Sequence, residues 1–340
     1  MYDIDNFANE PSARRVEAFQ EAAARLGFSQ AIVEKDFWVC WSLGKLFALP
    51  TFGDHMIFKG GTSLSKAYDV IYRFSEDVDL SLDRAQLGFT GETDPENPNL
   101  TGGQRKTMLQ DLQDAAEKCV NGPLLSELFS IFEAHLDQSF QLMADPNDAQ
   151  TLLFTYPSQQ VGGAGLGYVK PVIRFEFGAR GVKLPAEDRV IKPYLLEAIP
   201  DIFSNAETVV SVLGIERTFW EKATILHMLA HQPSGKPLAD RMSRHYYDMA
   251  MLIGQPSKDR AVDDIGLLEL VAHHKSVFFK AAWAHYETAK PGSLRLLPNK
   301  EIAQALKQDY AGMREMIIGD APKWNEILTL IDGFEIEVNG

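Results

Sequence analysis

The chain has 340 residues, of which 45% are hydrophobic and 24% charged, and its formal net charge is −14. The composition is ordinary for a globular protein, and the length favours two domains or one domain with a large extension. The acidic balance excludes a protein that wraps nucleic acid through phosphate neutralisation alone. With only Cys40 and Cys119 present, a disulfide framework and a cysteine-rich zinc site are also excluded.

The N-terminal residues, Met1 to Asp5, are acidic and polar and lack the basic start and apolar core of a signal peptide. No window holds about 18 uninterrupted apolar residues, so no transmembrane helix is expected. We therefore expect a cytoplasmic protein with no membrane partner, and the low cysteine content agrees with a reducing compartment.

Hydrophobic periodicity predicts the first elements. Apolar residues recur at three- and four-residue spacing over residues 31–47, which predicts a largely buried helix. The apolar run 56–58 predicts a short strand. A short helix running to Tyr72 should follow it, with a hydroxyl of Thr62 or Ser63 as its cap.

The middle of the chain mixes strands and helices. The remaining predicted elements of this half are a half-buried strand at 77–82, a long surface loop at 84–104, helices from 105 to about 140, and strands at 152–155 and 169–177. The glycine-rich run 162–167 misses the dinucleotide-binding fingerprint, because Tyr168 stands where the third glycine is required, and we interpret it as a turn.

Helical periodicity dominates from about residue 209 to the end, so we place a domain boundary near residue 208. Residues 1–208 carry 18 basic and 30 acidic side chains, and residues 209–340 carry 15 and 17. The negative charge is thus concentrated in the strand-bearing part. A cation-using site would produce this distribution, and so would solvated surfaces alone.

A glycine-rich turn follows the strand at 56–58. Gly60 and Gly61 let the backbone turn tightly and approach a ligand closely, and Thr62 and Ser63 add hydroxyls at the start of the next helix. Free backbone N–H groups together with such hydroxyls can cradle a phosphate. A glycine pair is common in ordinary turns, so this feature alone is weak.

Two carboxylates follow shortly after this turn. Asp77 and Asp79 point to the same side of their strand, because residues i and i+2 share a face. Adjacent carboxylates repel unless a cation or a proton intervenes, and oxygen-only ligands suit Mg²⁺, which substrate phosphates also bind. A solvated strand face is the alternative for the pair alone. Combined with the glycine turn and with Arg73 and Ser75 just ahead, the pair indicates a site for a metal-bound nucleoside triphosphate.

Charged residues also lie on predicted inward helix faces of the second half. Lys222 and Asp248 share the apolar stripes of their helices, and a buried charge needs a partner or a ligand. A buried salt bridge is the alternative for Lys222, and a pairing with an arginine such as Arg244 is the alternative for Asp248. Asp36 fits a site residue or a helix-packing salt bridge equally well.

Four segments of the chain form a combination of motifs. They are the run FKGGTSLSKAYDVIYRFSEDVDLSL, the segment Val33-Glu34-Lys35-Asp36, Glu221-Lys222-Ala223 and Arg244-His245-Tyr246-Tyr247-Asp248. Together these motifs resemble those of the AbiEii-type nucleotidyltransferase toxins, relatives of the DNA polymerase β nucleotidyltransferase superfamily. The resemblance covers about residues 31–332. His245 stands where relatives often have an aspartate.

The resemblance implies an α+β fold, with a mixed β-sheet flanked by helices in residues 1–208, followed by a helical lobe in residues 209–340 that contributes to the active site. It implies that Ser63 and the Gly60-Gly61 backbone hold the triphosphate, that Asp77 and Asp79 hold Mg²⁺, that Lys222 contacts phosphates, and that Asp248 completes the site.

Superfamily members often use a third carboxylate on a neighbouring strand. Residues 173–177 alternate between apolar and charged, so Arg174 and Glu176 share a face. Glu176 is the candidate, with a cross-strand ion pair as the alternative. Lys66 and Arg73 are candidate phosphate contacts or solvated surface groups.

The resemblance implies transfer of a nucleoside monophosphate from an NTP to an acceptor hydroxyl, with the 3′ end of tRNA as the expected acceptor. It also implies a toxin of a toxin–antitoxin or phage-defence pair with a separately encoded antitoxin. An NTP-binding module without turnover and a small-molecule nucleotidyltransferase are the alternatives.

Overall fold

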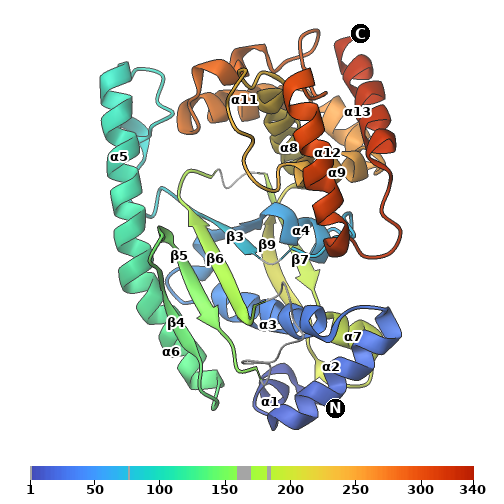
Figure 1. Cartoon of the computed structure of the whole chain (residues 1–340). Helices are drawn as coiled ribbons and strands as arrows, with labels where there is room; N and C mark the ends of the chain where they lie inside the picture. Colours follow the sequence, from blue (N-terminus) through green and yellow to red (C-terminus); the bar gives the residue numbers. More distant parts are fainter. Residues whose placement is uncertain (1, 76, 159–169, 182–184) are drawn as a thin grey trace. The chain divides into compact units, whose positions relative to one another are not determined.

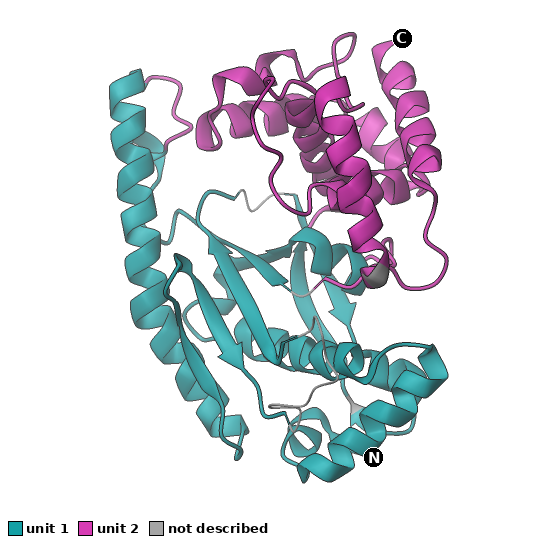
Figure 2. Ribbon diagram, viewed as in Figure 1, with its two compact units in different colours: residues 1–67, 76–94, 100–212 teal, residues 68–75, 95–99, 213–340 magenta. Residues whose placement is uncertain are grey.

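The computed structural model describes residues 2–75, 77–158, 170–181 and 185–340 (Figure 1). The chain divides into two compact units (Figure 2). Unit 1 comprises residues 1–67, 76–94 and 100–212, and unit 2 comprises residues 68–75, 95–99 and 213–340. Residues 68–75 are therefore part of unit 2, although unit 1 residues flank them in sequence. The glycine-rich run 162–167 lies outside the described residues.

Unit 1 is built on a mixed sheet, as the family resemblance implies. In spatial order its strands are β4 (Gln141–Asp145), β5 (Asp148–Thr155), β6 (Val172–Gly178), β3 (Asp77–Leu82), β2 (Met56–Lys59), β9 (Thr208–Leu213) and β7 (Ala186–Ile191). Strand β3 pairs antiparallel with β2 and parallel with β6, and β6 pairs antiparallel with β5. The short strands β1 (Tyr2–Asp3) and β8 (Phe203–Asn205) form a separate parallel pair.

Helices flank this sheet (Figure 1). They are α1 (Ile4–Ala8), α2 (Ser12–Leu26), α3 (Gln30–Phe47), α4 (Gly60–Lys66), α5 (Gly102–Cys119), α6 (Leu125–His135) and α7 (Tyr194–Ala198). Helix α3 is buried on nearly every side, as the apolar periodicity of residues 31–47 predicts, and Glu34, Lys35 and Asp36 are buried with the apolar residues. Trp41 of α3 and Phe132 of α6 meet Phe154 of β5, with the rings of Phe132 and Phe154 4.7 Å apart. This aromatic cluster covers one face of the sheet.

The central strands have two distinct faces because their residues alternate. Val78 and Leu80 of β3 and Phe175 and Phe177 of β6 are buried. Asp77 and Asp79 of β3 and Arg174 and Glu176 of β6 alternate with these residues, are half-exposed and lie on the opposite face. The alternation thus places an apolar face on the core and a polar face where a ligand can reach it.

Unit 2 is helical. It contains α8 (Ile215–Ala230), α9 (Ser243–Ile253), α10 (Ser257–Asp263), α11 (Gly266–Phe278), α12 (Lys300–Met313) and α13 (Trp324–Asn339). Phe219 and Leu226 of α8 and Leu306 and Tyr310 of α12 are buried, as their helical spacing in the sequence predicts. Among the described residues, no helix is long and apolar enough to span a bilayer.

Two element predictions were wrong at their ends. Helix α4 ends at Lys66 rather than at Tyr72, because residues 72–74 pair with the segment after α12: Phe74 N–H donates to the Met316 carbonyl at 2.7 Å, and Arg73 forms a β-bridge with Ile317. This pairing within unit 2 overrides the local helical pattern. The helix predicted to reach about residue 140 ends at His135, and a strand begins at Gln141.

Candidate active site

The glycine turn and the acidic strand lie against each other in unit 1. Lys59, the last residue of β2, pairs with Asp79 of β3, and the chain then turns at Gly60 with φ +79°. A Cβ atom on Gly60 would lie 1.9 Å from Oδ2 of Asp79. Only glycine fits there, both for its positive φ and for the space that the carboxylate occupies. The turn and the Asp79 carboxylate therefore form one structural feature.

The hydroxyls at this turn point inward. The Ser63 hydroxyl donates to the Gly60 carbonyl at 2.9 Å, and the Thr62 hydroxyl donates to the Asp77 carbonyl. Both residues are buried, and α4 has no side-chain cap, so the predicted capping role of Thr62 or Ser63 was wrong. The hydroxyls instead form hydrogen bonds within the first turn of α4 and to the first residue of β3.

Three carboxylates share the polar face of the sheet. In the parallel register of β3 and β6, Asp79 lies opposite Glu176, and Asp77 lies opposite Arg174. Burial raises the pKa of Glu176, and the negative charges of Asp79 and Asp77 raise it further. The side chains of Asp77 and Glu176 are 25% and 38% exposed. We call Asp77, Asp79 and Glu176 the acidic face.

Arg174 and Asp145 are neighbours of the acidic face that were not among the site residues predicted from the sequence. The Nε atom of Arg174 is 3.3 Å from Oε1 of Glu176 and 3.7 Å from Oδ1 of Asp77, and its Nη1 donates to Asp145. Glu176 thus pairs with a neighbour on its own strand rather than across strands. The alternation of Arg174, Phe175 and Glu176 was the available sequence signal, but Asp145 reaches the site only through the pairing of β4, β5 and β6.

The donor set of the acidic face fits a hard divalent cation. In the described ranges, no three His, Cys, Asp or Glu side chains are gathered closely enough to form a metal site by themselves. Mg²⁺ is commonly held by one or two carboxylates, with substrate phosphates and water supplying the other oxygens. Asp77 and Asp79 on one strand face meet that requirement, and their mutual repulsion leaves a charge for a cation to neutralise.

Lys66 lies in a different environment from the one expected for a phosphate contact. Its Nζ atom is 2.8 Å from Oδ1 of Asp36 and lies 3.7 Å from the centre of the Tyr194 ring. The side chains of Lys66 and Asp36 are 5% and 4% exposed, and the Tyr194 N–H donates to Asp36 Oδ2 at 2.6 Å. Burial opposes the charge on Lys66, but the Asp36 carboxylate raises its pKa above the ordinary value. The pair ties α4 to α3 and α7.

Unit 2 holds a buried cluster of charges, namely Arg73, Lys222, His245 and Asp248. Arg73 donates two hydrogen bonds to Asp248, from Nε to Oδ1 at 2.7 Å and from Nη2 to Oδ2 at 2.9 Å. Lys222 Nζ donates to the same Oδ2 at 2.7 Å and lies 3.3 Å from His245 Nδ1. The carboxylate is fully buried. Its partners are Arg73 and Lys222, whereas the sequence alternative named Arg244.

The charges of this cluster are strongly coupled. Burial alone would raise the pKa of Asp248, but Arg73 and Lys222 hold it well below its usual range. Burial lowers the pKa of Lys222, and burial together with Lys222 lowers that of His245 well below its ordinary value. Arg73, Lys222 and Asp248 together carry one more positive than negative charge.

The predicted site residues therefore fall into four groups. Asp77, Asp79 and Glu176 form the acidic face of unit 1. The turn beside it contains Gly60, Gly61, Thr62 and Ser63, and Lys66 lies in the buried pair with Asp36. Arg73, Lys222 and Asp248 form the buried cluster of unit 2, whose segment 68–75 also contains the half-buried Ser75.

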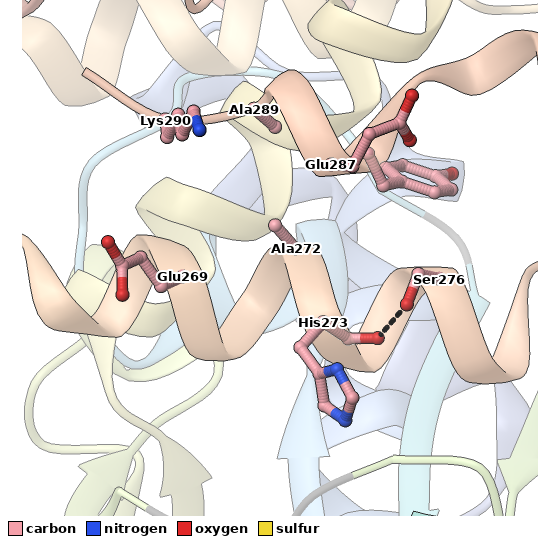
Figure 3. Close-up of a pocket in the computed structure, with 8 residues that line it drawn as sticks. Glu269, Ala272, His273, Ser276, Glu287, Ala289 and Lys290 are labelled. Carbon is pink, nitrogen blue, oxygen red and sulfur yellow. Dashed lines mark hydrogen bonds between the residues drawn. The ribbon is translucent and has the colours of Figure 1, made fainter.

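Unit 2 also contains a cavity of about 300 Å³ next to α11 (Figure 3). It is lined by Glu269, Ala272, His273, Ser276, Tyr286, Glu287, Ala289 and Lys290. The Ser276 hydroxyl donates to the His273 carbonyl at 2.7 Å. None of the predicted site residues lines this cavity.

Comparison with known proteins identifies the family. A family model described as "Nucleotidyl transferase AbiEii toxin, Type IV TA system" matches residues 41–330. The match spans most of the chain, so this protein belongs to the AbiEii family and is a nucleotidyltransferase toxin of the type IV toxin–antitoxin class. Membership implies an NTP substrate and an antitoxin partner. No curated protein matched the chain.

Two solved structures are similar over most of their length. MenT4, a nucleotidyltransferase toxin from Mycobacterium tuberculosis H37Rv, shares 16% identity over 88% of this chain and 99% of its own, with a TM-score of 0.42. JHP933 from Helicobacter pylori shares 14% identity over 91% of this chain and 94% of its own, with a TM-score of 0.37.

Proposed function

We propose that this toxin transfers a nucleoside monophosphate from an NTP to a hydroxyl of RNA, at the 3′ end of tRNA, in an Mg²⁺-dependent reaction in the cytoplasm. Membership in the AbiEii family supports the reaction class. The observation that carries the metal dependence is the acidic pair: Asp77 and Asp79 share one half-exposed strand face, and Asp79 lies directly against the turn at Gly60.

Asp77 and Asp79 would hold the cation, and Glu176 lies close enough to add to the negative field. When bound, Mg²⁺ would neutralise phosphate charge and stabilise the attacking and leaving oxygens. The Gly60-Gly61 backbone would admit the triphosphate beside Asp79, because no side chain occupies that space.

In the proposed reaction the acceptor hydroxyl attacks the α-phosphorus, the bond to the β-phosphate oxygen breaks, and pyrophosphate leaves while the hydroxyl loses its proton. The carboxylates position the reactants, which is the main contribution proteins make to phosphoryl and nucleotidyl transfer. No covalent intermediate with the protein is required.

Lys222 and Asp248 contribute through unit 2 in this proposal. Asp248 has both oxygens engaged by Arg73 and Lys222, so we assign it to holding Lys222 and Arg73 rather than to metal binding. The excess positive charge of these three side chains favours an anion such as phosphate and supports the phosphate contact that the family resemblance implies for Lys222.

Lys66 acts in a different way from the phosphate contact first expected. Its ammonium is buried against Asp36 and Tyr194, so we propose that it positions α4, which begins at the turn of Gly60 and Gly61.

The test uses purified protein, Mg²⁺, total RNA and each α-labelled NTP in turn. We expect label in a tRNA-sized band with one or more NTPs and none with the Asp77→Asn/Asp79→Asn double variant. NTP binding without pyrophosphate release would favour the binding module. Release of pyrophosphate that depends on an added small molecule rather than on RNA would favour the small-molecule enzyme. Either result would overturn the proposed acceptor.

A further inference from the structure

Arg174 occupies an unusual place on the acidic face. It is the one residue of β6 that lies opposite Asp77 in the parallel register, and its Nε atom is within 3.7 Å of both Asp77 Oδ1 and Glu176 Oε1. Its side chain is 38% exposed, so its charge is not hidden in the core. A fixed positive charge therefore lies at the place where the proposed function puts a divalent cation.

Asp145 anchors this arginine from the other side. Its Oδ2 accepts from Arg174 Nη1, and its Oδ1 accepts the backbone N–H of Asn147 at 2.9 Å and the Asn147 side-chain amide at 3.3 Å. The Asp145 side chain is 4% exposed. Both of its oxygens are thus engaged, and the carboxylate holds the guanidinium towards β4.

We propose that Arg174 is the internal counter-cation of the acidic face and that Asp145 holds it back far enough for a divalent cation to bind at Asp77 and Asp79. This inference rests on the metal site in the proposed function. Arg174 is a positioning residue here: it acts through the carboxylates and sets their affinity for the metal.

The sign of the effect follows from electrostatics. A positive charge near the Asp77 carboxylate competes with the incoming cation, so its removal makes metal binding tighter. Loss of Asp145 has the opposite consequence, because the guanidinium becomes free to pair more fully with the acidic face and one nearby negative charge is lost. A purely structural role would predict weaker binding for both changes.

The test measures binding of Mn²⁺ alone to the full chain without nucleotide, by electron paramagnetic resonance. Arg174→Gln removes the charge, Arg174→Lys keeps it, and Asp145→Asn removes the anchor. Asp259→Asn, at an exposed acid of unit 2, is the matched control. We expect about tenfold tighter binding for Arg174→Gln, near wild-type binding for Arg174→Lys, and several-fold weaker binding for Asp145→Asn.

Unchanged or weaker binding by folded Arg174→Gln would overturn the inference, with circular dichroism and thermal melting as the check on folding. If neither the wild type nor Arg174→Gln binds Mn²⁺, the metal site of the proposed function fails together with it. If the wild type binds and only the direction of the Arg174→Gln effect is wrong, the proposed metal site survives and the counter-cation role does not.

Discussion

The acidic face of unit 1 and the buried cluster of unit 2 contain similar chemical groups in opposite states. Asp248 is fully buried and both of its oxygens are neutralised by Arg73 and Lys222. Asp77 and Glu176 are partly exposed, and partial burial together with the neighbouring negative charges raises the pKa of Glu176. The buried carboxylate is neutralised by cationic partners, whereas negative charge is left in excess on the accessible face.

This difference separates two roles that sequence alone does not distinguish. A buried ion-paired cluster is costly to break, because loss of its carboxylate leaves buried cations without their partner. An exposed cluster with excess negative charge destabilises the fold, because like charges repel. Removal of one of its carboxylates is therefore tolerated by the fold, but it weakens the binding of a ligand that needs the charge. The variants below exploit that contrast.

The largest expected effect is on activity. Asp79→Asn should lower nucleotide transfer by roughly a thousandfold or more, since a carboxylate that holds the cation and faces the turn at Gly60 is lost. Transfer of labelled NMP under saturating NTP measures it. Asp111→Asn, an exposed acid on α5, serves as the control and should retain full activity. Equal activity of both variants would show that Asp79 is not a residue of the active site.

The next effect is on stability of unit 2. Asp248→Asn should lower the free energy of unfolding by about 3–5 kcal/mol, because Arg73 and Lys222 then remain buried without their carboxylate. Urea unfolding followed by circular dichroism measures the loss, and Asp259→Asn should change little. A variant as stable as the wild type would contradict the buried ion-paired cluster. Lowering the pH should also lower the free energy of unfolding. The pKa of Asp248 in the folded protein is below its ordinary value, so the ionised carboxylate stabilises the fold above the ordinary carboxyl pKa. This stabilisation is lost as the pH falls below the ordinary carboxyl pKa.

A smaller effect is expected for the ion pair of Lys66 and Asp36, which connects α4 to α3. Asp36→Asn and Lys66→Met should each destabilise unit 1 by about 3 kcal/mol, and the double variant should lose about 2 kcal/mol less than the sum of the two. Urea unfolding of the four proteins of this cycle measures the coupling. Additive losses, or a Lys66→Met variant that raises the KM for NTP at unchanged stability, would return Lys66 to the role of a phosphate contact.

The smallest effect concerns Glu34 of α3, which is 3% exposed. Burial raises its pKa to about 6, against which Ser158 and Arg15 act. Because the folded-state pKa is the higher one, the wild type loses stability as the pH rises from about 4.5 past 6, by about 2 kcal/mol in all. The free energy of unfolding of Glu34→Gln, relative to that of the wild type, should therefore be about 2 kcal/mol higher at pH 8 than at pH 4. Urea unfolding at the two pH values measures this difference. A pH-independent difference would contradict this pKa.

Much of the fold was predictable because its signals are local. Alternation identified β3 and the buried and exposed faces of β6, and periodicity identified α3 and α8. The end of α4 was not predictable, because residues 72–74 pair with a segment more than 240 residues further along the chain.

The environments of the candidate residues were less predictable than their identities. Asp248 was selected as an inward-facing charge, but its partner Arg73 lies 175 residues away in sequence. Arg174 was visible as a neighbour of Glu176, whereas Asp145 becomes its partner only when β4, β5 and β6 align. No periodicity carries information about contacts of this range.

The most direct test of the contrast is the melting temperature of the Asp77→Asn/Asp79→Asn double variant in the presence of a chelator. If the acidic face is held for a cation, the variant melts at or above the wild-type temperature, because repulsion between like charges has been removed, and it transfers no nucleotide. If it melts far below the wild type, as expected for Asp248→Asn, the two aspartates are structural and the proposed metal site is wrong.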